Sequence, residues 1–372
     1  MRVLILSCNT GGGHNAVSAA IQEAFAARGA DCETRDALAF LSERASEFIC
    51  NWHTRIYRYM PGAFKAGYRF TENHPALYDQ DTLFDKFLTS GVERLGGFME
   101  AGHYDITVCP HVFSALMVTR VREQRPGCGG AACFVATDYT CSPMANESRL
   151  DRYFIPAESL VQEFTADGIP AEKLVPLPGI PVRRSFFSKH PKKTAKKAMG
   201  MPEDCRHILI MFGSMGCGPV TELTGELLEL TEPDTRITVV CGTNEHLKKK
   251  LKKLYGDTER IRILGYAGDI DLLMDSADLY VTKPGGISTA EAAVKGLPMV
   301  LVNAVSGCEE YNLRHFCGLG GAVTAEGNRA LAELCADLLA SPERLEKMSG
   351  ALGVKGSAAE ELCRVMTQEA EA

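Results

Sequence analysis

The sequence contains no long hydrophobic run and no excess of basic residues. No stretch of about 18 consecutive apolar residues occurs, so no segment is expected to span a bilayer as a helix. The apolar run MRVLILSC at the start is too short for the hydrophobic region of a signal peptide. The formal net charge of -7 argues against nucleic acid as a partner of the whole chain. Any contact with a membrane is therefore expected to be peripheral.

The cysteines lack the spacing of a zinc site. All 14 are scattered singly between Cys8 and Cys363, mostly in apolar surroundings, and no two form a CxxC pair. Structural zinc sites use closely spaced cysteine pairs, and disulfide frameworks belong to oxidising compartments. We therefore expect buried, reduced thiols in a cytoplasmic protein, with no metal site.

Length and patterning together predict two α/β domains. A chain of 372 residues exceeds what one hydrophobic core usually organises. A buried strand, a glycine-rich loop and a helix follow one another in RVLILSCNTGGGHNAVSAAIQEAF, and the same order begins again at HILIMFGSMGCG. Strands and helices alternate after both points, as in parallel sheets made of βαβ units. We expect domains at residues 1–183 and 184–340, with a helical tail at residues 341–372 that packs back on the first.

The first glycine-rich loop, TGGGHNAVSAA, contains Gly11, Gly12 and Gly13. Glycines allow a tight turn after a strand and expose backbone amides at a helix N-terminus, where a phosphate or another polar group is favoured. The loop has neither the lysine of a Walker A motif nor the glycine order of a dinucleotide site, which argues against kinases and dehydrogenases. His14 lies at the mouth of this loop, either as a general base for a hydroxyl group or as a helix cap.

Two further polar residues end predicted strands of the same half. His111 closes the strand YDITVCPH, and Asp138 lies at the end of AACFVATDYT. The carboxyl ends of parallel strands meet at one edge of a sheet, so we expect both residues near His14. A carboxylate beside an imidazole fixes its tautomer and raises its basicity, whereas the alternative for Asp138 is an ordinary turn residue.

The second half contains a motif with the parts of a nucleotide site, TKPGGISTAEAAVKGLP. It predicts a strand, a glycine pair and two hydroxyl residues before a helix with an acidic residue in its first turn. The loop fits the oxygens of a diphosphate, and the acidic residue fits the diol of a ribose. These residues are Gly285, Gly286, Ser288, Thr289 and Glu291.

Two other segments of the second half are candidates for the same site. The loop GSMGCG offers Gly213 and Ser214 as a second backbone approach to the diphosphate. The segment SGCEEYN places Glu309, Glu310 and Asn312 where hydroxyl groups of a sugar would bind. The alternative for these acidic residues is simple solvation.

The segments GGGHNAVSA and TKPGGISTAEAAVKGLPMVL resemble those of the monogalactosyldiacylglycerol synthases and bacterial processive diacylglycerol glucosyltransferases, distant relatives of MurG. The resemblance covers nearly the whole chain, including NWHTRIYRYMP, VATDYTCSP and GCEEYN. It implies a GT-B fold of class α/β, in which two Rossmann-like domains face each other across a cleft. The first domain would then bind the acceptor, and the second would bind the UDP-sugar.

The resemblance also implies an activity. Members of this family are inverting glycosyltransferases, which suggests transfer of a hexose from UDP-glucose or UDP-galactose to diacylglycerol without a metal or another cofactor. His14 is then the base on the acceptor hydroxyl, with His111 and Asp138 lining the cleft. Glu291 would bind the ribose, and the diphosphate would be held by Gly285, Gly286, Ser288 and Thr289.

Two positions depart from the family's usual pattern. Relatives have a late motif close to Pro-Gly-Gln-Glu, whereas this chain has the segment Ser306-Gly307-Cys308-Glu309 in the expected sugar pocket. Ser142 stands where relatives often have histidine or another polar residue before a proline. The donor sugar and the details of the acceptor site therefore stay open.

An aromatic and basic segment lies between about residues 40 and 100, inside the first predicted domain. Such a mixture sits well at a headgroup interface and predicts contact with anionic lipids at the inner face of the cell membrane. Basic runs at residues 183–197 and 248–253 would add about 1 kcal/mol for each charge near the surface. Alternatively, the aromatic side chains pack in the core and the basic ones are solvated. The residues in question are Trp52, Arg55, Tyr57, Arg58 and Tyr59.

Two other functions stay open at this point. A UDP-sugar 2-epimerase shares the GT-B architecture and the nucleotide site but needs no lipid-binding segment. A catalytically inactive UDP-sugar sensor would bind the nucleotide and a protein partner, although the presence of His14 and Glu291 argues against it.

Overall fold

The computed structural model describes the chain except for residues 10–11, 42–81, 83–85, 88, 303–306 and 372. The chain forms two compact units. Unit 1 comprises Met1–Arg184, Val305–Cys308 and Lys355–Ala372, and unit 2 comprises Ser185–Ala304 and Glu309–Val354. Each unit contains one six-stranded sheet whose described pairings are all parallel.

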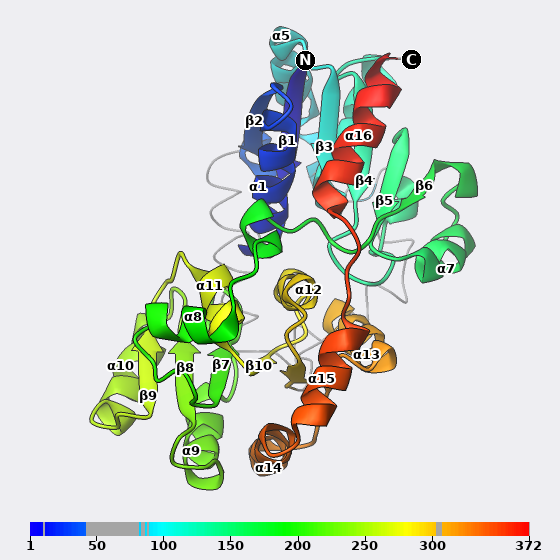
Figure 1. Ribbon diagram of the computed structural model, residues 1–372. Coiled ribbons are helices and arrows are strands. Elements are labelled where there is room, and N and C mark those ends of the chain that lie inside the picture. The colour runs from blue at the N-terminus through cyan, green and yellow to red at the C-terminus, as the bar shows by residue number, and fades with distance from the viewer. Residues whose placement is uncertain (10–11, 42–81, 83–85, 88, 303–306, 372) are drawn as a thin grey trace. The chain divides into compact units, whose positions relative to one another are not determined.

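The sheet of unit 1 has the strand order β2-β1-β3-β4-β5-β6 (Figure 1). Its central strands are continuous apolar runs, because a parallel sheet with helices on its faces buries both sides of each strand. The strands are β1 (Arg2–Ser7), β2 (Asp31–Asp36), β3 (Ile106–Cys109), β4 (Ala131–Val135), β5 (Arg152–Ile155) and β6 (Leu174–Pro176).

The first helix of unit 1 buries an apolar stripe against this sheet. In α1 (Gly12–Ala26), Val17, Ile21 and Phe25 recur at intervals of one helical turn and are fully buried. The last helix, α16 (Ala358–Glu371), returns to unit 1 and packs beside α1, red beside blue in Figure 1. The other helices are α5 (Val92–Gly102), α6 (Val112–Gln124) and α7 (Val161–Ala166).

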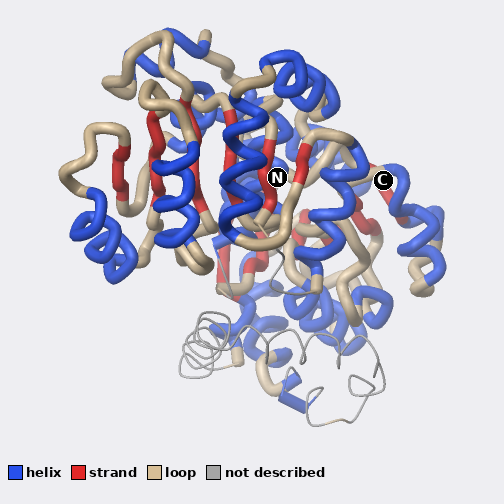
Figure 2. The backbone as a smooth tube through the Cα atoms, turned by 90° about the horizontal axis from the view of Figure 1, so that it is seen from below, coloured by secondary structure: helices blue, strands red, loops and turns tan. Residues whose placement is uncertain are grey.

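The sheet of unit 2 repeats this architecture with the order β12-β11-β10-β7-β8-β9. Figure 2 distinguishes the strands in red from the blue helices that run alongside them. The strands are β7 (His207–Met211), β8 (Arg236–Val240), β9 (Ile261–Leu264), β10 (Leu279–Thr282), β11 (Met299–Leu301) and β12 (Ala322–Val323). The helices are α8 (Lys192–Ala198), α9 (Val220–Leu230), α10 (Glu245–Tyr255), α11 (Ile270–Ser276), α12 (Gly286–Lys295), α13 (Cys308–Leu319), α14 (Asn328–Leu339) and α15 (Pro342–Ala351).

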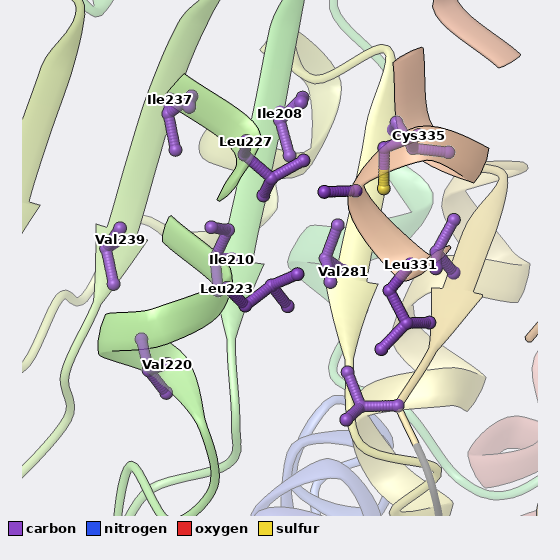
Figure 3. Close-up of a cluster of buried hydrophobic side chains, with 14 of the residues drawn as sticks. Ile208, Ile210, Val220, Leu223, Leu227, Ile237, Val239, Val281, Leu331 and Cys335 are labelled. Atoms are coloured by element: carbon purple, nitrogen blue, oxygen red, sulfur yellow. The ribbon is translucent and has the colours of Figure 1, made fainter. Parts of the chain in front are cut away.

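The core of unit 2 lies between this sheet and the helices α9 and α14 (Figure 3). Leu223 and Leu227 of α9 point toward the strands, as Figure 3 shows, and both are fully buried. Leu331 and Cys335 from α14 lie in the same cluster beside Val281 of β10. A one-turn spacing of apolar residues on each helix therefore closes this face of the sheet.

Two buried ion pairs lie inside unit 2, and the first of them attaches the segment that begins it. Lys196 of α8 lies 2.8 Å from Asp278, and its side chain is only 5% exposed. Burial alone would raise the pKa of Asp278, but Lys192 and Lys196 hold that pKa below its usual value. Lys295 pairs with Asp275 at 2.9 Å in the same unit. A buried charge is stable only when it is paired in this way.

Both sheets have a topological switch point, and these positions determine where ligands bind in such folds. In unit 1 the chain leaves β1 toward β2 and leaves β3 toward β4, so the switch lies between β1 and β3. In unit 2 it lies between β7 and β10. Ligands of open α/β sheets bind outside the carboxyl ends of the strands at such points.

Candidate functional site

The side chain of His14 lies at the switch point of unit 1. The residue belongs to the first turn of α1, which begins at Gly12, so the predicted glycine turn is already partly helical and includes Gly13. Its Nδ1 atom lies 2.9 Å from the carbonyl oxygen of Pro110, which follows β3. A carbonyl oxygen only accepts, so Nδ1 carries the hydrogen in the neutral imidazole. Nε2 is then the atom with the lone pair, as a general base requires.

His111 is the N-cap of α6. Its Nδ1 accepts a hydrogen bond of 3.1 Å from the backbone N–H of Phe113. The neutral ring therefore carries its hydrogen on Nε2, the opposite tautomer to His14. The two rings meet edge to face with centroids 4.5 Å apart. The sequence prediction that both histidines share one edge of the sheet agrees with this contact.

Thr137, which follows β4 by two residues, contacts the ring of His14. The Thr137 Oγ1 atom lies 3.4 Å from His14 Nδ1, and the half-buried Asp138 is the next residue. The loop beyond is held by Glu163, whose Oε1 accepts hydrogen bonds from Thr140 Oγ1 at 2.6 Å and from the Cys141 backbone N–H at 2.7 Å. Sequence reasoning missed Thr137, although its place beside Asp138 at a strand end is a signal that could have found it.

Burial makes two thiols of this sheet unreactive. Cys109, at the end of β3, is fully buried, and burial raises the pKa of its thiol to about 12. Burial likewise raises the pKa of Cys133 in the neighbouring strand well above its ordinary value. Both thiols are neutral at physiological pH and are poor nucleophiles.

The loop after β7 lies at the switch point of unit 2. Gly213 has φ +69°, and a Cβ atom there would come within 3.0 Å of Lys283 Cε. Ser214 is exposed, and its carbonyl oxygen accepts a hydrogen bond from the Thr243 backbone N–H at 2.9 Å. Asn244 Nδ2 donates to the Gly216 carbonyl oxygen at 3.1 Å and thereby ties this loop to the one after β8.

The helix α12 begins earlier than its sequence predicts. Gly285 is its N-cap, the helix starts at Gly286, and Glu291 consequently lies in its second turn rather than its first. The fully buried Thr289 hydroxyl donates within this turn, at 2.9 Å from the Gly285 carbonyl oxygen and 3.0 Å from that of Gly286. Ser288 is 7% exposed, and Glu291 is half-buried. The Thr289 hydroxyl is therefore engaged within the turn, and the backbone amides of the helix start are what this segment offers to an anion.

A buried ion pair that the sequence did not suggest lies beside the start of α12, at the carboxyl end of β10. Lys283 Nζ lies 3.0 Å from Glu309 Oε1 of α13, with the two side chains 17% and 8% exposed. Asn312, also on α13, donates from Nδ2 to the Pro284 carbonyl oxygen at 3.0 Å and is fully buried. Glu310 is half-buried on the same helix. The predicted residues Glu309 and Asn312 therefore hold the loop between β10 and α12.

Several predicted residues lie outside the described part of the chain. Among the residues that the structure describes, no group of three histidine, cysteine, aspartate or glutamate side chains could hold a metal ion. None of the described helices is long and apolar enough to cross a membrane. The predicted residues that are not described are Gly11, Trp52, Arg55, Tyr57, Arg58, Tyr59 and Ser306.

Two protein families match successive parts of the chain. The family Monogalactosyldiacylglycerol (MGDG) synthase matches residues 14–182. The Glycosyltransferase family 28 C-terminal domain matches residues 207–362. The first match covers His14 and His111, and the second covers the loops at the switch point of unit 2.

Similar proteins extend over almost the same length. The processive diacylglycerol beta-glucosyltransferase of Bacillus cytotoxicus is 27% identical over 95% of this chain and 89% of that protein. The protein of the same name from Bacillus subtilis is 27% identical over 93% and 89%, respectively.

Solved structures show the fold. MurG of Acinetobacter baumannii superposes with a TM-score of 0.67 at 14% identity, over 99% of both chains. UDP-GlcNAc 2-epimerase from Neisseria meningitidis does so with a TM-score of 0.63 at 13% identity, over 99% of this chain and 100% of that one. The GT-B fold of two Rossmann-like units, expected from the sequence, is thereby confirmed.

Proposed function

We propose that this chain, which belongs to the diacylglycerol glycosyltransferases, transfers glucose or galactose from a UDP-sugar to diacylglycerol with inversion. Like its relatives, it joins a monogalactosyldiacylglycerol synthase domain to a family 28 C-terminal domain. The donor would be UDP-glucose or UDP-galactose, and the product would be a glycolipid. A single displacement by the acceptor hydroxyl on the side opposite the departing UDP produces the inversion.

The observation that carries this mechanism is the hydrogen bond between His14 Nδ1 and the Pro110 carbonyl oxygen. It selects the tautomer whose Nε2 accepts a proton. We assign His14 as the general base that takes the proton from the acceptor hydroxyl as it attacks the anomeric carbon. Correctly placed general bases accelerate such steps by roughly 10²–10⁴-fold.

His111 and Asp138 would support this base. The tautomer of His111 presents an N–H at Nε2, which suits it to donate to an oxygen of the acceptor while its ring packs on His14. Asp138 lies next to Thr137, which contacts His14, and we assign it to the electrostatic stabilisation of the imidazolium that forms. Gly11, Gly12 and Gly13 would let the acceptor approach the start of α1.

The donor would bind at the switch point of unit 2. The backbone amides at the start of α12 and in the loop containing Gly213 and Ser214 favour a diphosphate. Ser288 and Thr289 would shape this turn, and Glu291 would accept hydrogen bonds from the ribose hydroxyl groups. For the donor sugar we propose contacts with Glu309, Glu310 and Asn312 near the start of α13.

An anionic membrane surface is the proposed setting, since diacylglycerol is a membrane lipid. The helix α10 contains five lysines between Lys248 and Lys253, of which Lys249, Lys250, Lys252 and Lys253 are exposed. Lysines near an anionic bilayer contribute about 1 kcal/mol each. We propose that this face and the segment containing Trp52 bind the inner face of the cell membrane peripherally.

The proposal is tested with purified protein, diacylglycerol in anionic vesicles, and UDP-glucose, UDP-galactose or UDP-GlcNAc carrying a radiolabelled sugar. Label in the lipid from one hexose donor, with an inverted anomeric bond by NMR, is the expected result. Conversion of UDP-GlcNAc without any acceptor would instead identify an epimerase. Binding of UDP with no turnover of any donor would identify a sensor.

A further inference from the structure

The ammonium group of Lys283, at the edge of unit 2 where the donor is proposed to bind, forms an ion pair with the carboxylate of Glu309. Nζ and Oε1 are 3.0 Å apart, and both side chains are largely buried. A carboxylate so close to an ammonium group stabilises its charge and reduces its attraction for another anion.

Lys283 also lies where a diphosphate would bind. It follows β10 directly, two residues before the N-cap Gly285, and its Cε lies against Gly213 of the loop after β7. β7 and β10 are the strands on either side of the switch point. The ammonium group is thus next to both backbone segments that are suited to phosphate oxygens.

The partner carboxylate is held firmly in place. Glu309 is in the first turn of α13, and this helix is fixed to the same loop by the hydrogen bond from Asn312 Nδ2 to the Pro284 carbonyl oxygen. Glu309 is therefore a fixed anionic partner of Lys283, and a donor would bring a further anion with more negative charge than a single carboxylate.

We propose that Glu309 restrains Lys283 when the donor is absent and that the diphosphate of the donor takes the ammonium group over from this carboxylate. The inference rests on the proposed function, because it presupposes a nucleoside diphosphate at this switch point. Breaking the ion pair opposes binding, so the affinity for UDP is lower than the cation alone would provide. Removing the negative charge of Glu309 then strengthens UDP binding, and only while Lys283 is present.

The test is calorimetric titration of UDP into the full-length protein, its Glu309→Gln and Lys283→Gln variants, and the double variant. Glu309→Gln is expected to tighten binding by about threefold to tenfold, since no ion pair with Lys283 then has to break before the ammonium group meets the diphosphate. Lys283→Gln is expected to weaken UDP binding by at least about tenfold, because a charged hydrogen bond to the diphosphate is lost. In the Lys283→Gln background, the Glu309→Gln change has no further effect.

Controls separate this exchange from a general effect of charge. Glu333→Gln removes a negative charge from α14, where Glu333 pairs with Arg329, and is expected to leave the affinity unchanged. If Glu309→Gln lowers the melting temperature, Glu309→Asp serves as the second variant. It keeps the charge but moves the carboxylate one methylene away from Lys283, and it is expected to tighten UDP binding by a smaller factor.

Unchanged or weaker UDP binding by both Glu309 variants overturns the inference while the proposed function stands. So does a tightening that persists in the Lys283→Gln background, because the carboxylate would then repel the phosphates directly. A wild-type protein that binds no UDP at all overturns both the inference and the proposed function.

Discussion

The Nδ1 atom of His14 donates a hydrogen bond of 2.9 Å to the carbonyl oxygen of Pro110, 96 residues away in the chain. This contact joins the start of α1 to the end of β3 across the switch point of unit 1. It fixes the imidazole tautomer without a carboxylate, since a backbone carbonyl performs the orienting role. His111 has the opposite tautomer because its Nδ1 caps α6. The pair thus presents one acceptor and one donor at Nε2.

The two roles of His111 are separable by substitution. His111→Ala is expected to destabilise unit 1 by about 1 kcal/mol through loss of the helix cap, and to slow transfer. His111→Asn provides a new capping oxygen, so it should restore the stability but not the rate. Thermal melts and initial transfer rates of the three proteins check this. Full activity of His111→Asn would limit His111 to the cap.

Glu291 is predicted to read the ribose of the donor. Glu291→Ala should weaken UDP binding by about tenfold or more, as expected for lost hydrogen bonds to a charged group. The sharper measurement compares UDP with 2′-deoxy-UDP by calorimetry. Wild type should prefer UDP, and the variant should bind the two ligands about equally. A preference that survives in Glu291→Ala would assign the ribose contact to another residue.

The exposed lysines of α10 are predicted to contribute to membrane binding. Replacing Lys249, Lys252 and Lys253 with glutamine should reduce sedimentation with anionic vesicles at least about tenfold, given about 1 kcal/mol per charge. Binding to uncharged phosphatidylcholine vesicles should not change. Lys250 lies 3.4 Å from Glu222, which partly neutralises its charge, so Lys250→Gln is expected to reduce sedimentation less than the single change Lys249→Gln. Equal sedimentation of wild type and the triple variant would exclude this face as a contact.

His207 makes the stability of unit 2 depend on pH. It is fully buried between Thr238 Oγ1 and Ser276 Oγ, and burial lowers its pKa from 6.5 to about 4. The unfolded chain takes up a proton below pH 6.5 while the folded state stays neutral, so stability falls as the pH drops toward 4. Between pH 7 and pH 5 the loss is about 2 kcal/mol.

Denaturant unfolding at both pH values measures this dependence. The variant His207→Gln should lose about 2 kcal/mol less than wild type between pH 7 and pH 5. The difference between the two proteins isolates His207 from His315, whose pKa is also lowered to about 4 by burial. Identical losses in both proteins would contradict the assignment.

The elements that the sequence predicts well are those whose environment is uniform along the chain. Runs such as RVLILS and HILIM are strands because parallel strands are buried on both faces. Once the strands are known, residues that follow them must gather at one edge, which is why His14 and His111 could be named in advance.

Contacts that depend on packing could not be predicted in this way. The sequence does not show that the Thr289 hydroxyl donates to the carbonyl oxygen of Gly285, the N-cap of α12. The pairing of Lys283 with Glu309 depends on where α13 packs against the end of β10, which no local pattern records. The tautomers of the two histidines likewise depend on partners outside their own motifs.

The most direct test of the central claim is the initial rate of sugar transfer to diacylglycerol in anionic vesicles by wild type and by His14→Ala. UDP affinity is measured on both proteins, because the proposed nucleotide site lies in the other unit. The account predicts a rate lower by about 10²–10⁴-fold in the variant, with unchanged UDP affinity. A variant that transfers sugar within a few-fold of the wild-type rate would show that His14 is not the base.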